Sequence, residues 1–336
     1  MIERSLAKSR YFQDRTSSEL SPLSVGLLLE GASLGLRTAF VSEKKNARKL
    51  HQFLENISLN QKFVHSLPRM RIDLYTFLDE TKLSQSIIPQ VEFSNLDVSF
   101  FWRQLDTYEL VIFDHCSLQT IKKIPLLAFL RRRSPRTEFV FLSSNEKEQD
   151  ILSSEFQLTS EIVYKKQGNP FKQQSLSAII GNGRGKSSYA FGRLILSFIE
   201  KKSPKLIYFD KADPLYPERD FFIALKRWSS ENALYGNFDF AVTGSSRYDR
   251  MRGAYREGTS EQDIREAKAA MQLLETALRK RTPVVADELL DALERKLLDK
   301  KNVNSVLAKV KDECIMTGQH VDKDLAALCS EIIEVK

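Results

Sequence analysis

The stretch LSAIIGNGRGKSSYAFGRLILSFIE, residues 176–200, decides the fold of the second half of the chain. Its apolar start predicts a strand over 176–180, a glycine-rich loop follows at 181–185, and Lys186 then opens an amphipathic helix. Glycines let backbone amides converge on phosphate oxygens, the start of the helix adds a positive dipole, and the lysine adds a cation. The order strand, loop, helix therefore predicts a phosphate-binding loop (P-loop), not an ordinary glycine-rich turn.

Predicted strands alternate with helices through this half, which is typical of a mostly parallel sheet covered on both faces. The clearest helix spans 260–280, where apolar residues recur every three or four positions and form one core-facing stripe. The predicted strands are 176–180, 206–210, 238–242, 283–286, 313–317 and 331–335.

The first half follows a similar plan. A helix is predicted over 19–34, and "ELVIFDH", a helix, "EFVFLSSN", a helix and "SEIVYKK" parallel the order of elements that ends the second half. This pattern indicates an internal duplication, joined by a polar linker at 165–174 that contains a glycine and a proline. The predicted strands of this half are 38–41, 110–113, 139–142 and 162–164.

Composition sets further bounds on the protein. The chain has 336 residues, of which 42% are hydrophobic and 28% charged, as in ordinary globular proteins. No run approaches the 18 apolar residues of a membrane helix, and residues 1–20 carry charges throughout, so we expect a cytoplasmic protein without membrane contact. Cys116, Cys314 and Cys329 lie in apolar runs without metal-ligand spacing, which favours buried reduced thiols.

The formal net charge of +7 is compatible with nucleic acid, acidic lipid or a phosphate-bearing small molecule as partner. The densest basic run, Arg131, Arg132, Arg133 and Arg136, ends a predicted helix over 121–132, where it complements the helix dipole. A solvated helix end is favoured over a nucleic-acid patch. A basic ATPase associated with nucleic acid stays open as a third reading, supported only by this charge and the arginine run.

The loop departs from the ordinary Walker A pattern, because Ile180 stands where a glycine is expected five residues before Gly185. Its compact form, Gly-Asn-Gly-x-Gly-Lys-Ser-Ser followed by Ala-Phe-Gly at 190–192, resembles the P-loop of ATP:corrinoid adenosyltransferases. The likeness continues in order through "LIYFDKA", "FDFAVTGSS", the helix at 260–280, "VVADELLDAL" and "CIMTGQHVDKDLAALCSEIIEVK". It thus covers nearly the whole second half.

The resemblance implies ATP and Mg²⁺ as cofactors and a corrinoid as substrate. It implies catalytic roles for Lys186 and Arg184 at the triphosphate, and Mg²⁺ ligation by Ser187, Glu288 and Asp287. Without the resemblance, an Asp-Glu pair is usually a favourable charge at a helix start; the apolar strand before it and the P-loop favour a metal site. The nucleotide-binding residues would be Gly181, Asn182, Gly183, Arg184, Gly185, Lys186, Ser187, Ser188 and Gln319.

Two positions depart from the family's pattern. The arginine of the family's closing "TGRG" is Gln319 here, so a cationic contact to nucleotide is lost or comes from His320 or Arg184. The family's corrinoid-facing aromatic pair is replaced by 245–248, where Tyr248 alone keeps an aromatic face. Nucleotide binding is therefore better supported than corrinoid handling.

In the first half, counting back from Gly26 places Leu20 where the P-loop lysine would stand, and the acidic pair becomes Asp114-His115. We expect no triphosphate to bind there in this way. His115 is a weak candidate for a ligand or an acid-base group, since a single histidine at a strand end is more often structural.

We therefore expect two tandem three-layer α/β/α domains of the P-loop NTPase kind with mostly parallel sheets. Residues 1–168 would be a degenerate adenosyltransferase-like copy without a P-loop, and residues 169–336 the nucleotide-binding domain. The resemblance implies transfer of the 5′-deoxyadenosyl group of ATP to a cob(I) corrinoid with release of triphosphate. The alternative is a regulatory or chaperone-like ATP-binding protein that has lost corrinoid chemistry. The chain would act as a monomer with an internal pseudo-dimer, or as a homodimer.

Overall fold

The apolar run that precedes the glycine-rich loop forms strand β8 (Leu176–Gly181), which lies inside a parallel sheet. Its neighbours on the two sides are β12 (Cys314–Gly318) and β13 (Glu331–Val335), both parallel to it. A strand that is buried on both faces and flanked on both sides needs the nearly continuous apolar sequence found here. Helix α8 (Gly185–Ile199) follows directly.

The chain divides into two compact units, Met1–Tyr164 and Lys165–Lys336. The computed structural model describes residues 9–14, 20–42, 47–58, 71–76, 91–95, 107–116, 137–143, 158–167, 176–181, 185–209, 218–231, 237–242 and 261–335. Among the residues so described, no helix combines the length and the apolar character that crossing a membrane requires.

The sheet of the second unit has the strand order β10-β9-β11-β12-β8-β13, with parallel pairings throughout. The strands not yet named are β9 (Lys205–Tyr208), β10 (Asp239–Val242) and β11 (Val284–Asp287). The P-loop strand β8 is thus separated from β11 by β12. All these strands point the same way, so the residues that follow β8, β11 and β12 meet at one edge of the sheet.

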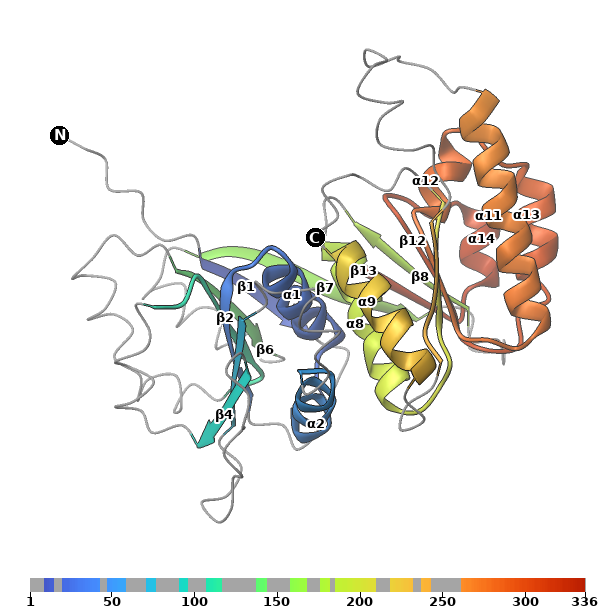
Figure 1. Ribbon diagram of the computed structural model, residues 1–336. Coiled ribbons are helices and arrows are strands. Elements are labelled where there is room, and N and C mark those ends of the chain that lie inside the picture. The colour runs from blue at the N-terminus through green and yellow to red at the C-terminus, as the bar shows by residue number, and fades with distance from the viewer. Residues whose placement is uncertain are drawn as a thin grey trace. The chain divides into compact units, whose positions relative to one another are not determined.

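Helices cover both faces of this sheet (Figure 1). Helix α8 and α9 (Glu218–Glu231) lie on one face. On the other lie α11 (Glu261–Arg279), α12 (Leu289–Glu294), α13 (Lys300–Leu307) and α14 (Lys323–Leu328). Val284 and Ala286 join the core beneath α11, whose apolar stripe Ala267, Ala270, Met271, Leu274 and Ala277 is buried. The predicted three-layer α/β/α class with mostly parallel strands is confirmed.

The strands of the first unit have the order β7-β1-β6-β5-β2-β3-β4, again with parallel pairings. The helices described here are α1 (Pro22–Ser33) and α2 (Ala47–Ser58). The strands are β1 (Ser9–Asp14), β2 (Arg37–Ser42), β3 (Arg71–Thr76), β4 (Val91–Asn95), β5 (Leu110–Asp114), β6 (Glu138–Ser143) and β7 (Leu158–Gln167).

Both units use one strand order. Starting from the last strand of each unit, the order is the last strand, the first, the penultimate, the strand before that, and the second, followed by one or two further strands. The predicted linker at 165–174 is wrong at its start, because β7 continues to Gln167. The helix predicted over 121–132, with its arginine run, lies outside the described residues.

Candidate nucleotide-binding site

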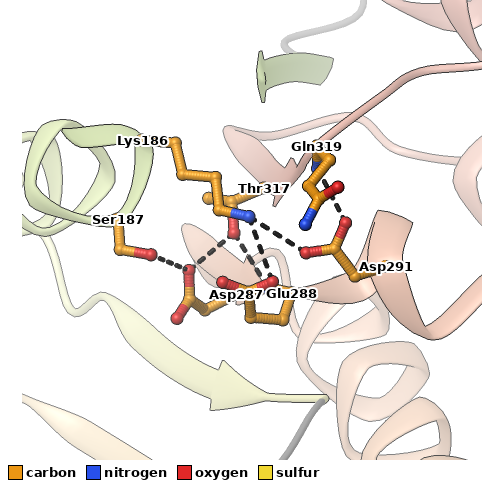
Figure 2. Close-up of polar contacts among 7 residues, drawn as sticks. All are labelled: Lys186, Ser187, Asp287, Glu288, Asp291, Thr317 and Gln319. Carbon is orange, nitrogen blue, oxygen red and sulfur yellow. Dashed lines mark hydrogen bonds and ion pairs between the residues drawn. The ribbon is translucent and has the colours of Figure 1, made fainter. Parts of the chain in front are cut away.

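The site lies where β8, β11 and β12 end and α8 begins. Ligands of open parallel sheets bind at the carboxyl ends of the strands, and the first turn of a helix presents unpaired N–H groups to an anion. Lys186 and Ser187 belong to the first turn of α8, Asp287 ends β11, and Thr317 lies near the end of β12. Figure 2 shows these side chains converging with those of Glu288 and Asp291.

Asp287 is the centre of the buried part of the site. Its side chain is fully buried, and its Oδ1 accepts hydrogen bonds from Ser187 Oγ at 3.1 Å and from Thr317 Oγ1 at 2.6 Å. Burial raises the pKa of Asp287 above its usual range, while the two hydroxyl groups act in the opposite direction. Strands β11 and β12 and helix α8 are thereby joined at one carboxyl group.

Lys186 lies beside this centre and is 4% exposed. Its Nζ is 3.2 Å from Glu288 Oε2 and 3.0 Å from Asp291 Oδ2. Burial alone would lower the pKa of Lys186, but the two acidic side chains outweigh it and raise the pKa above the usual value. The lysine is thus a buried, fully charged ammonium group at the start of a helix.

Glu288 has an unusual backbone. Its φ of 60° lies in the left-handed region, which is rare for a residue with a side chain and is often found at functional sites. Its N–H donates to Thr317 Oγ1 at 2.8 Å, which holds this conformation. Burial, followed by the hydrogen bond to Asp291 and the charge of Asp287, raises the pKa of Glu288 to about 9.

Asp291 connects the lysine to the chain after β12. Its Oδ1 accepts the N–H of Gln319 at 2.7 Å, while Oδ2 faces Lys186. Burial would raise the pKa of Asp291, but hydrogen bonds from Glu288, the Gln319 N–H and Lys186 lower it. Gly318 allows this close approach, because a Cβ at that position would collide with Leu290 and press on Asp291.

The structure brings together five of the residues that the sequence predicted for the site: Lys186, Ser187, Asp287, Glu288 and Gln319. Of the other predicted residues, Gly181 ends β8 and Ser188 is buried on α8. At Gly181 a Cβ would collide with the carbonyl oxygen of Val335. Gly185 is the first residue of α8, and His320 lies exposed after Gln319. The predicted residues Asn182, Gly183, Arg184 and Tyr248 lie outside the described residues.

Sequence reasoning missed Thr317 and Asp291. Thr317 could have been found as the hydroxyl residue that ends an apolar strand predicted to lie in the same sheet as Asp287. Asp291 is three residues after Glu288, and residues at this spacing share a face of a helix. Its contact with Lys186 depends on tertiary structure, so sequence spacing alone does not reveal it.

The oxygen atoms beside Asp287 suit magnesium, a hard cation that binds through one or two carboxylates, waters and substrate phosphates. Ser187 Oγ and Asp287 Oδ1 are neighbours at 3.1 Å, and Glu288 follows directly in the chain. In the described part of the chain, no group of three or more His, Cys, Asp or Glu side chains could hold a metal by itself.

The first unit contains a related arrangement. Asp114 ends β5, is fully buried, and accepts hydrogen bonds from Ser24 Oγ at 2.7 Å and Ser42 Oγ at 3.1 Å. Ser24 is the third residue of α1, as Ser187 is of α8, so Leu23 stands where Lys186 stands. The prediction of Leu20 for this position is wrong by three residues. The next residue, His115, has a left-handed φ of 50°, like Glu288.

Comparison with known proteins agrees with this geometry. Residues 172–336 match the family model described as ATP:corrinoid adenosyltransferase BtuR/CobO/CobP. No curated protein matches the chain. The match begins just before β8 and includes every residue of the site described above.

Proposed function

Because residues 172–336 belong to the ATP:corrinoid adenosyltransferase family, we propose that this half of the chain transfers the 5′-deoxyadenosyl group of ATP to a cob(I) corrinoid. The observation that carries the proposal is the position of Lys186, a buried cation in the first turn of α8, next to the hydroxyl group and carboxyl group of Ser187 and Asp287. A triphosphate that approaches this helix start meets the lysine, the helix dipole and a pair of oxygen ligands for a metal.

In the proposed reaction the reduced cobalt of the corrinoid attacks the ribose C5′ of ATP. A cobalt–carbon bond forms, the bond from C5′ to the triphosphate oxygen breaks, and triphosphate leaves with that electron pair. The two electrons of the new bond come from cob(I), so no other reductant takes part, and no side-chain base has to remove a proton. The work left to the protein is to place the reactants and to stabilise the leaving anion.

Different residues of the site would stabilise different parts of the leaving anion. Lys186 neutralises the charge that grows on the departing triphosphate, and the amides at the start of α8 donate hydrogen bonds to it. We assign Arg184 to the same anion from its place in the loop. The packing of β8, β11 and β12 against α8 keeps the buried side of the site dry, which strengthens each of these interactions.

Ser187 and Asp287 would hold Mg²⁺, with Glu288 as a further oxygen ligand. The ion would supply charge neutralisation for the phosphates. Ser187 now donates to Asp287, so the hydroxyl group and the carboxyl group would exchange this hydrogen bond for the metal. Thr317 would still orient the carboxyl group from the other side.

Residues 1–164 act in this proposal as a degenerate copy that binds no triphosphate. The common strand order and the shared aspartate-serine contact support it, and Leu23 removes the cation. One chain would then bind one ATP and act as a monomer with an internal pseudo-dimer.

A second candidate is an ATP-binding regulatory protein without corrinoid chemistry. Gln319 favours it, because a neutral side chain follows β12 where the family has an arginine. Both candidates require ATP binding that depends on Lys186, and only the first requires adenosylated product.

The test is an anaerobic incubation of the full chain with Mg-ATP and chemically reduced cobalamin, followed by detection of light-sensitive adenosylcobalamin. The Lys186→Ala variant removes the buried cation, and Lys301→Ala is the matched control, since Lys301 is exposed on α13. Product that requires Lys186 but not Lys301 is the expected result. ATP binding without product would select the regulatory candidate, and no ATP binding would refute both.

A further inference from the structure

The two carboxylate oxygens of Asp291 contact two different parts of the site. Oδ2 lies 3.0 Å from Lys186 Nζ, and Oδ1 accepts the Gln319 N–H at 2.7 Å. The side chain is 13% exposed, so solvent screens these contacts only weakly. Figure 2 shows the carboxylate between Lys186 and Gln319.

These contacts reduce the positive potential that an incoming anion meets. Lys186 is the phosphate-facing cation of the described site, and acidic side chains already lie on it at 3.0 and 3.2 Å. A triphosphate must share the ammonium group with Asp291 or displace it. If the triphosphate displaces Asp291, the carboxylate also loses the geometry in which it holds the backbone at Gln319.

On this basis, and resting on the proposed function, we propose that Asp291 is a positioning residue that limits the affinity of the site for triphosphate through Lys186. The limit acts on charge, so it increases from adenosine, which is neutral, through ADP and ATP to free triphosphate. It therefore weakens the hold on the leaving triphosphate more than the hold on the adenosine part of the substrate. Asp291 thus favours release of the inorganic product.

The variant Asp291→Asn tests this inference, because the amide oxygen can still accept the Gln319 N–H while the negative charge that Asp291 places beside Lys186 is removed. Binding of magnesium tripolyphosphate to the full chain is measured by calorimetry, with adenosine as the neutral probe. We expect the tripolyphosphate affinity to rise about three- to tenfold and the adenosine affinity to stay unchanged. Slower release of tripolyphosphate should account for the gain.

A double-mutant cycle with Lys186→Met separates this charge effect from a structural one. In the Lys186→Met background, Asp291→Asn should have no effect on tripolyphosphate binding. Asp291→Ala also removes the acceptor for Gln319, and we expect a smaller gain in affinity together with a lower melting temperature. Asp299→Asn is the control, since Asp299 also accepts a backbone N–H, from Asn302 at 3.1 Å, on α13.

The outcomes distinguish the two proposals. The role of Asp291 would be overturned, and the proposed function left intact, if Asp291→Asn bound tripolyphosphate no more tightly than the unaltered chain. The same would follow if Asp291→Asn raised the affinity equally in the Lys186→Met background. Binding of ATP and tripolyphosphate by Lys186→Met as tightly as by the unaltered chain would overturn both.

Discussion

At the end of β11 in the second unit, Asp287 receives a hydrogen bond from Ser187; at the end of β5 in the first unit, Asp114 receives one from Ser24. Both aspartates are fully buried, and burial raises the pKa of each. Both serines are the third residue of the helix that follows the first strand of their unit. The two units thus share a structural joint between a helix and the middle of the sheet.

The units differ in what surrounds this joint. Lys186 precedes Ser187 and is held by carboxylates, whereas Leu23 precedes Ser24 and is completely buried. In the first unit the Ser42 hydroxyl donates to the other carboxylate oxygen of Asp114, Oδ2. Under the proposed function, the buried aspartate and its serine partner are structural in the first unit, and the cation beside this pair marks the nucleotide site of the second.

The largest effect should come from making the second site resemble the first. Lys186→Met keeps the apolar stem of the side chain and removes the charge. Loss of a charge-assisted hydrogen bond should weaken Mg-ATP binding roughly 10- to 100-fold. Calorimetry should also give one ATP for each unaltered chain. Two equivalent sites per chain would contradict the view that Leu23 has disabled the first unit.

The next prediction compares a methyl group added at Gly318 with a change at the equivalent position of the first unit, Ser143. The register places Gly318 opposite Ile180 of the P-loop strand and Ser143 opposite Gln13 of β1, so a residue with a Cβ occupies the equivalent place in the first unit. Gly318→Ala should cost about 2 kcal/mol of stability, because the Cβ would collide with Leu290. Thermal unfolding measures the cost, and Ser143→Ala, which keeps the Cβ, should cost less. Equal melting temperatures for Gly318→Ala and the unaltered chain would refute the close approach of α12.

Matched changes at the two aspartates should have a smaller effect on binding. Asp287→Asn removes a proposed metal ligand while keeping an acceptor for Thr317, so Mg-ATP affinity should fall roughly tenfold, with little change in the presence of EDTA. Asp114→Asn should leave Mg-ATP affinity unchanged. A magnesium-dependent loss in Asp114→Asn would mean that the first unit also binds metal and nucleotide.

Much of the second unit could be predicted because its strands are short, continuous apolar runs. The strand predicted over 331–335 has the observed bounds, and the others differ by one or two residues at their ends. In the first unit β1, β3 and β4 were missed, since SRYFQD, RIDLYT and VEFSN mix charged and apolar residues. Their place in the sheet comes from pairing with neighbouring strands, which a local pattern does not contain.

The parts of the candidate site that depend on local sequence motifs could be predicted, whereas side-chain contacts between distant segments could not. Lys186, Ser187 and Asp287 could be identified because strand, loop and helix occur in sequence. Asp291 reaches Lys186 only through the packing of α12. The counterpart of Lys186 in the first unit was misplaced at Leu20 because the count back from Gly26 did not include the contact of Ser24 with Asp114. Equivalence between the units is therefore set by the contact with the aspartate, not by counting residues.

The smallest expected effect is on stability and comes from the ion pairs of Asp239 on the outer strand β10. The pairing of β9 with β10 begins with Lys205 opposite Asp239, and that of β2 with β3 begins with Arg37 opposite Arg71. Burial would raise the pKa of Asp239, but Lys205 and Lys226 lower it to about 2. Because this pKa is depressed in the folded chain, the stabilisation is complete above the ordinary value of 3.8 and is lost as the pH falls towards 2.

The side chain of Asp239 is 45% exposed, so screening should limit the contribution of its ion pairs to roughly 0.5 kcal/mol. Asp239→Asn should therefore lower the stability at pH 7 by that amount, measured by urea unfolding, and the difference from the unaltered chain should shrink below pH 4. A difference that stays constant with pH would show that the ion pairs do not hold β10.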